Sequence, residues 1–120
     1  MKIDVARGML IALLMASGVI AASAMDEKPF LQENRSAMDR MMRDMMAPPS
    51  GDADRDFAAM MIAHHQGAID MAMAELRHGH NEQLRRIAQE IIVDQQQEIV
   101  AMRLAVSHGA ASVDGVSHAH

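Results

Sequence analysis

The 120-residue sequence contains no cysteine, no tryptophan and no tyrosine, and only two phenylalanines. Without cysteine the chain cannot form a disulfide, a zinc–thiolate site or an iron–sulfur cluster. It has no aromatic platforms on which bases could stack, and its formal net charge is -5, so we do not expect nucleic acid as a partner. Neither a glycine-rich phosphate loop nor a nucleophile–base pair is present, which leaves hydrolytic chemistry without a candidate.

Methionine is abundant instead, with 14 residues in the chain. Its side chain is flexible and apolar and carries a polarizable thioether sulfur. So many methionines beside so few aromatics indicate either a soft hydrophobic core or a store of thioether ligands for a metal.

The N-terminus has the three parts of an export signal. They are a basic start with Lys2 and Arg7, an apolar run over residues 9–20, and the small residues Ala22-Ser23-Ala24. We predict a cleaved signal peptide over residues 1–24, which places the mature protein in the periplasm without membrane contact. An uncleaved membrane anchor is the alternative, although the run is short for a span of about 20 residues.

Hydrophobic periodicity predicts three helices and no strand. The first covers about residues 30–46 and stops before Pro48-Pro49, because proline cannot continue a helix. The second is capped by Asp52 or Asp54 and runs to His78, with Gly79 as its C′ residue. The third is capped by Asn81 and ends near His108-Gly109, and residues 110–120 are predicted to form a disordered tail that contains histidine.

The acidic residues at the start of the second helix have the spacing of a calcium loop, D-x-D-x-D. A calcium loop needs a glycine at its sixth position and a bidentate glutamate at its twelfth. The sequence has Phe57 and Ala63 there. Helix capping therefore explains these carboxylates better than calcium does.

The predicted fold class is all-α. The second and third helices should form an antiparallel hairpin because only a short turn joins them, and the shorter methionine-rich helix should lie across its open side. This helical metal-binding domain spans residues 25–109. Three helices make a thin core, so dimerisation into a larger bundle is plausible.

The second helix combines a buried-type pattern with metal-binding chemistry. At about 100° per residue, one stripe of this helix carries both apolar side chains and side chains that can bind a metal. We expect this stripe to be buried, with His65 at its edge. Its members are Phe57, Met60, Met61, His64, Ala68, Met71, Glu75 and His78.

Methionine and histidine are neighbours on this helix. Met60 and Met61 precede His64 and His65 respectively by four residues, a spacing that brings two side chains together. Thioethers favour Cu(I) and imidazoles bind copper in both oxidation states, so the donor set indicates copper, with Cu(I) preferred. Met41, Met42 and Met45 of the first helix could complete a thioether cluster. The alternatives are hydrogen-bonded histidines and a methionine stripe that serves packing alone.

Glu75-Leu76-Arg77-His78 matches the E-x-x-H motif of di-metal carboxylate bundles, although one chain carries a single copy. Glu98 could add a carboxylate, and a dimer would supply the second motif. Glu75 and Glu98 could equally make interfacial hydrogen bonds. His78-Gly79-His80 and His118-Ala119-His120 are more typical of solvated segments than of metal sites.

The sequence from about Met38 to Met102 also resembles the bacterial exported proteins of domain-of-unknown-function family 305. The resemblance rests on Asp54-x-x-Phe57-x-x-x-Met61-Ile62-x-His64-His65-x-x-Ala68-Ile69-x-Met71-Ala72 and on the third-helix pattern from Leu84 to Met102. It implies a ferritin-like bundle and copper binding through methionine and histidine, linked to periplasmic copper tolerance. The motif positions that carry over are Met61, His64, His65 and Met71.

We therefore expect a periplasmic protein that sequesters copper or passes it to other periplasmic copper proteins, and not a catalyst. Glu75, Gln95 and Glu98 would orient the imidazoles or act as hard ligands for Cu(II). One rival is a di-metal oxidase that acts as a dimer. The other is a helical interaction module of the envelope that binds no metal.

Overall fold

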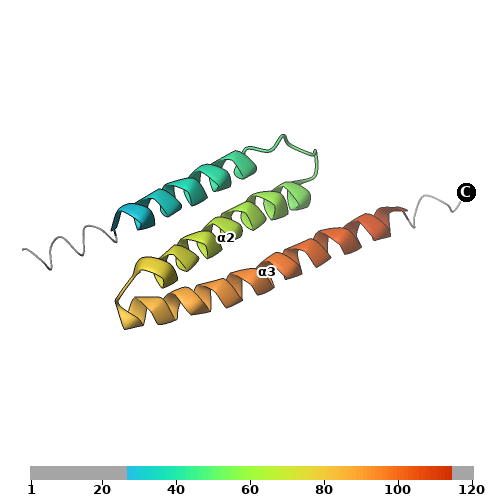
Figure 1. The fold of residues 1–120 in the computed structure, drawn as a ribbon. Helices are drawn as coiled ribbons and strands as arrows, with labels where there is room; N and C mark the ends of the chain where they lie inside the picture. The colour runs from blue at the N-terminus through green and yellow to red at the C-terminus, as the bar shows by residue number, and fades with distance from the viewer. Residues whose placement is uncertain (1–26, 115–120) are drawn as a thin grey trace, which may run out of the picture.

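The computed structural model describes residues 27–114, and all its regular structure is helical. An N-terminal helix covers residues 27–45, α2 runs over Ala53–His78 and α3 over Glu82–Asp114. Consecutive helices are antiparallel (Figure 1). This confirms the predicted all-α class and the helical hairpin. The predicted signal peptide and the last part of the tail lie outside the described residues.

Side-chain caps fix where α2 and α3 begin. The Asp52 carboxylate accepts hydrogen bonds from the backbone N–H groups of Asp54 and Arg55 at 2.9 and 3.1 Å. The Asn81 side-chain oxygen accepts one from the Leu84 N–H at 3.0 Å. Each cap satisfies donors that have no partner inside the helix, and both follow the sequence prediction.

Gly79 ends α2 in a different way from the one predicted. Its backbone is extended, with φ -76° and ψ 151°, and not in the left-handed conformation of a typical C′ glycine. A side chain at this position would run into the Glu75 carboxylate. Because these atoms are the flexible end of the Glu75 side chain, a substitution at Gly79 would displace the carboxylate.

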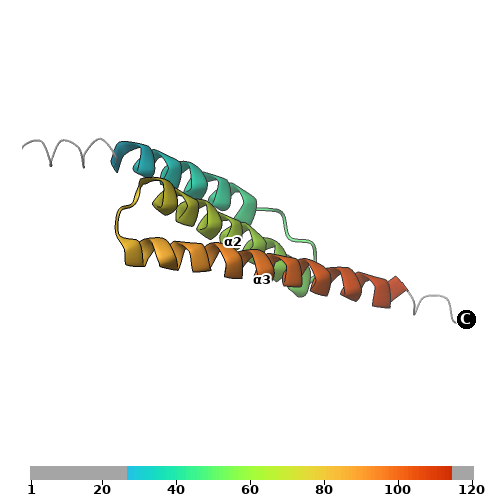
Figure 2. The same cartoon turned by 60° about the horizontal axis from the view of Figure 1, so that its bottom comes forward.

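α2 is the central helix of the three (Figures 1 and 2). On one side Gly67 contacts Met41 of the N-terminal helix, and on another His65 contacts Glu98 of α3. At about 100° per residue, Gly67 lies roughly 200° around α2 from His65. The two neighbours therefore occupy nearly opposite sides of α2, and within residues 27–114 no helix covers its two further sides.

The core consists mostly of small side chains. Among the described residues, the buried apolar positions are Ala37, Ala58, Ala63, Ile69, Ala72, Ala74, Ala88 and Ile99, and no large side chain is fully buried. Small residues at a contact let two helices approach closely, but each alanine removes little apolar surface from water. Apart from Ile69 and Ile99, the larger apolar side chains remain outside this core.

α3 is longer than predicted. It continues through Gly109 to Asp114, past the expected end near His108-Gly109, so this part of the predicted tail is helical. A single glycine in a helix costs only about 1 kcal/mol relative to alanine, and the alanines that follow favour helix. None of the helices described here is long and apolar enough to span a bilayer.

Candidate metal site

His65 is the buried histidine of the pair. It is 6% exposed, and its Nε2 lies 2.5 Å from Glu98 Oε2 of α3. Because an ionised carboxylate only accepts hydrogen bonds, Nε2 is the donor. The other ring nitrogen, Nδ1, is buried and has no hydrogen-bond partner. Glu98 thus makes the interfacial hydrogen bond that the sequence left open as an alternative.

His64 is exposed, and its ring lies 6.0 Å from that of His65, at 63° to it. The prediction that His64 belongs to a buried stripe is therefore wrong for the single chain. Phe57 and Met60 of that stripe are also exposed, by 59% and 44%. The remaining candidates on α2, Met61, Met71 and Glu75, are half-buried.

The reason for this difference is the size of the residues at the helix contacts. α2 packs through Ala58, Ala72 and Ala74, and through Gly67, all of which are buried. The periodicity of large apolar residues predicts an apolar stripe on α2. The contacts with the two neighbouring helices are made by the small residues on either side of that stripe. The stripe consequently lies between the two contact sides of α2.

The methionines of the N-terminal helix differ in how far they are buried. Met41 is half-buried and lies so close to Gly67 that a Cβ there would be 2.7 Å from its sulfur. Met45 is also half-buried, whereas Met42 is 53% exposed. Gly67 therefore lets the Met41 sulfur lie directly against α2, less than one turn after the histidine pair.

Helix geometry places several candidate ligands on one side of the three helices. When neighbouring helices are antiparallel, positions that follow the contact residues on both helices lie on the same side of the pair. His64 follows the buried Ala63 of α2, and Met38 follows the buried Ala37 of the N-terminal helix. Met42 likewise follows Met41, which contacts Gly67.

α3 contributes to the same side. On α2, His64 directly precedes His65, which contacts α3. On α3, Ile87 likewise directly precedes the buried Ala88. Because the two helices are antiparallel, His64 and Ile87 lie on the same side of the pair. We call this side the methionine face. It comprises Leu31, Met38, Met42 and Met45 of the N-terminal helix, Phe57, Met60, His64 and Met71 of α2, and Leu84, Ile87 and Ile91 of α3.

The opposite side, which we call the polar face, is marked by hydrogen bonds between charged and amide groups. Asp70 accepts one from Arg40 of the N-terminal helix at 3.2 Å and one from Gln66 at 3.1 Å. Since Asp70 and Gln66 lie away from the His64 side of α2, the two faces of the molecule differ in chemistry.

A second polar cluster joins the N-terminal helix to the end of α2. Glu33 accepts hydrogen bonds from Arg77, at 2.5 and 2.9 Å, and its other oxygen lies 2.9 Å from His78 Nε2. The hydrogen bond from Arg77 first, and that from His78 second, hold the pKa of Glu33 below its ordinary value of 4.5. Sequence reasoning missed this cluster, because Glu33 lies more than 40 residues from Arg77 and His78 and only the packing of the helices joins them.

The di-metal motif is not assembled within the part of the chain that the structure describes. His78 faces Glu33, whereas the Glu75 carboxylate lies over Gly79, and no three His, Asp or Glu side chains in residues 27–114 come together as metal ligands.

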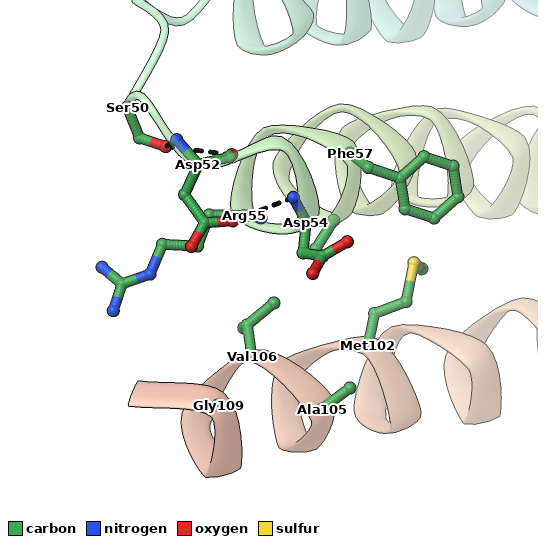
Figure 3. Close-up of a pocket in the computed structure, with 10 residues that line it drawn as sticks. Ser50, Asp52, Asp54, Arg55, Phe57, Met102, Ala105, Val106 and Gly109 are labelled. Carbon is green, nitrogen blue, oxygen red and sulfur yellow. Dashed lines mark hydrogen bonds between the residues drawn. The ribbon is translucent and has the colours of Figure 1, made fainter. Parts of the chain in front are cut away.

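A cleft of about 650 Å³ lies between the start of α2 and the end of α3 (Figure 3). Phe57, Met102 and Val106 supply apolar walls, and Asp52, whose carboxylate caps α2, lies at the rim. No histidine lines it. The cleft is therefore separate from the paired histidines and does not form part of the candidate metal site.

The chain was compared with known protein families. The model of a family described as "Domain of unknown function (DUF305)" matches residues 8–106, which is most of the chain. The chain belongs to the DUF305 family.

The matched DUF305 region contains every candidate ligand named above, from Met41 to Glu75, together with Glu98. The family description assigns no function, and no curated protein matches the chain. The function must therefore be argued from the side chains themselves.

Proposed function

We propose that this DUF305 protein binds copper outside the cytoplasm and sequesters it or hands it on. The observation that carries the proposal is the position of His64 on the same face as Met60 and Met42, which are 44% and 53% exposed in the single chain. Thioether and imidazole groups are soft and intermediate donors that suit Cu(I), and imidazole also binds Cu(II).

His65 would support the site from inside. A metal-binding histidine usually donates its second ring N–H to a carboxylate, which fixes the tautomer and makes the ring a better ligand. His65 has this arrangement: Glu98 accepts from Nε2, and Nδ1 is buried without a partner. In the neutral ring, Nδ1 then carries the lone pair that a metal ion needs.

The other candidate ligands have graded roles in this proposal. Met61, Met71 and Glu75 are half-buried on α2 and could move outward to complete the coordination. Met41 and Met45 approach from the N-terminal helix, where Met41 rests on Gly67. Because thioethers favour Cu(I) and imidazoles bind copper in both oxidation states, the mixed set suits sequestration or transfer more than catalysis.

Anaerobic titration with Cu(I) against a chromogenic chelator tests the proposal. We expect His64→Ala/His65→Ala to lose stoichiometry or affinity relative to the wild type. Met60→Leu and Met73→Leu make a matched pair, because both residues are on α2 and are 44% and 41% exposed, but Met73 lies on the polar face. Met60→Leu should weaken binding and Met73→Leu should not. Equal affinity and stoichiometry in all four proteins would mean that the methionine face does not bind copper.

We also propose that the protein is exported through cleavage after Ala24. Intact-mass measurement of the protein, purified from cells that express the full-length chain, should show a mature start at Met25. A mass that includes residues 1–24 would contradict cleavage and favour a retained N-terminal anchor.

A further inference from the structure

We infer that the methionine face is the interface between two copies of this chain. Seven of the large apolar side chains on this face are at least 41% exposed. They are Leu31, Met38, Met42, Phe57, Met60, Leu84 and Ile87. Apolar surface on this scale is unusual in a monomer and marks an interaction site.

The size of the face fits a stable dimer. With about 200 Å² for each large side chain, of which about half is exposed, seven side chains present on the order of 700 Å². A typical specific interface takes about 800 Å² from each partner. The half-buried Met45, Met71 and Ile91 bring the face close to that value.

The weakness of the core identifies the occupant as a second copy. In the part of the chain described, the buried apolar residues are six alanines and two isoleucines, so a single copy removes little apolar area from water. A two-fold dimer uses the same patch on both copies and would cover both open faces at once. Six helices would then surround one core of methionine, leucine and isoleucine.

The dimer also accounts for the sequence pattern of α2. The stripe from Phe57 to Met71 has the periodicity of a buried face, but the single chain exposes Phe57, Met60 and His64. In the dimer this stripe lies inside the assembly. The central place of α2 puts His64 of each copy near the middle of the interface. The inference stands without copper, since it rests on apolar area alone.

Sedimentation velocity of the chelator-treated, metal-free protein tests the inference apart from the proposed function. We expect the wild type to have twice the mass of the chain and Met42→Glu/Ile87→Glu to have the mass of one chain. The matched control is Val93→Glu/Val100→Glu on α3 outside the methionine face, at positions 51% and 55% exposed, and it should remain a dimer. A monomeric wild type, or equal behaviour of the two double variants, would overturn the inference.

Thiol labelling gives a second test that does not depend on a destabilising variant. The chain has no cysteine, so single replacements report on one position each. Met42→Cys should react slowly with a maleimide and faster on dilution, whereas Val100→Cys should react at a rate independent of dilution. Slow labelling of Met42→Cys in a protein that is monomeric would mean that another part of the chain covers the face, and would overturn the dimer.

Discussion

The buried imidazole of His65 depends on a carboxylate from another helix. Glu98 is 60% exposed in its side chain, whereas that of His65 is only 8% exposed, so the free-energy cost of losing the pair falls on the histidine. Nδ1 already lacks a partner, and removal of the carboxylate would leave both ring nitrogens without one. A buried polar group that is left unpaired costs about 1–3 kcal/mol.

A double-mutant cycle tests this dependence. Glu98→Ala should lower the free energy of unfolding by about 1–3 kcal/mol in the wild type, but by less than about 0.5 kcal/mol in a His65→Leu background, where no imidazole needs a partner. Urea denaturation followed by circular dichroism measures both. Equal losses in the two backgrounds would mean that Glu98 stabilises the protein through contacts other than the imidazole.

Glu33 gives the protein a pH dependence at the acid end. Its pKa is held below 4.5 in the folded state by Arg77 and His78, so its contribution is present above the unfolded pKa and is lost as the pH falls through the folded value. Glu33→Gln should therefore be less stable than the wild type near neutral pH, and the difference should shrink below pH 4.5. Urea midpoints across this range, with Asp39→Asn as a control, measure the effect. A difference that stays constant with pH would rule out the ion-pair explanation.

At the scale of the element, glycine and alanine in α2 determine how closely its neighbours pack. Gly67 is buried, and a Cβ at this position would lie 3.0 Å from Met41 Cβ as well as 2.7 Å from its sulfur. Since one of these atoms is at the rigid base of the side chain, a simple rotation of Met41 cannot relieve the contact.

Gly67→Ala should consequently destabilise the protein, although alanine is favoured over glycine within a helix by about 1 kcal/mol. In a Met41→Ala background the contact disappears, and Gly67→Ala should then be neutral or stabilising by up to about 1 kcal/mol. Thermal denaturation of the four proteins completes the cycle. A stabilising Gly67→Ala in the wild type would show that the two helices are not in close contact at this point.

Sequence reasoning predicted the helices and their caps correctly, because both depend on short-range features of the sequence. These are the hydrophobic periodicity and the capping side chains of Asp52 and Asn81. It placed His64 inside and His65 at the edge, and the structure reverses them. The error came from treating large apolar residues as the contact, whereas Ala63 and Gly67 form it. The Glu33 cluster and the Glu98–His65 pair depend on helix register, which a single sequence pattern does not determine.

At the scale of the whole molecule, the fold has a thin core and one apolar face. If two copies cover that face, unfolding releases two chains, and the urea midpoint should rise with protein concentration. The midpoint of Met42→Glu/Ile87→Glu should be lower and independent of concentration. A wild-type midpoint that does not change over the micromolar range would contradict linkage between folding and association.

In the single chain, the exposed thioethers of Met38, Met42 and Met60 also make this surface open to chemical change. An oxidant converts methionine to its sulfoxide, which is polar and no longer a soft sulfur donor. One oxygen atom per side chain would thus remove a ligand and make the surface more water-soluble. An apolar surface built from leucine would resist such damage. Because this surface is built from methionine, its polarity and its ability to bind a soft metal depend on the oxidants around the protein.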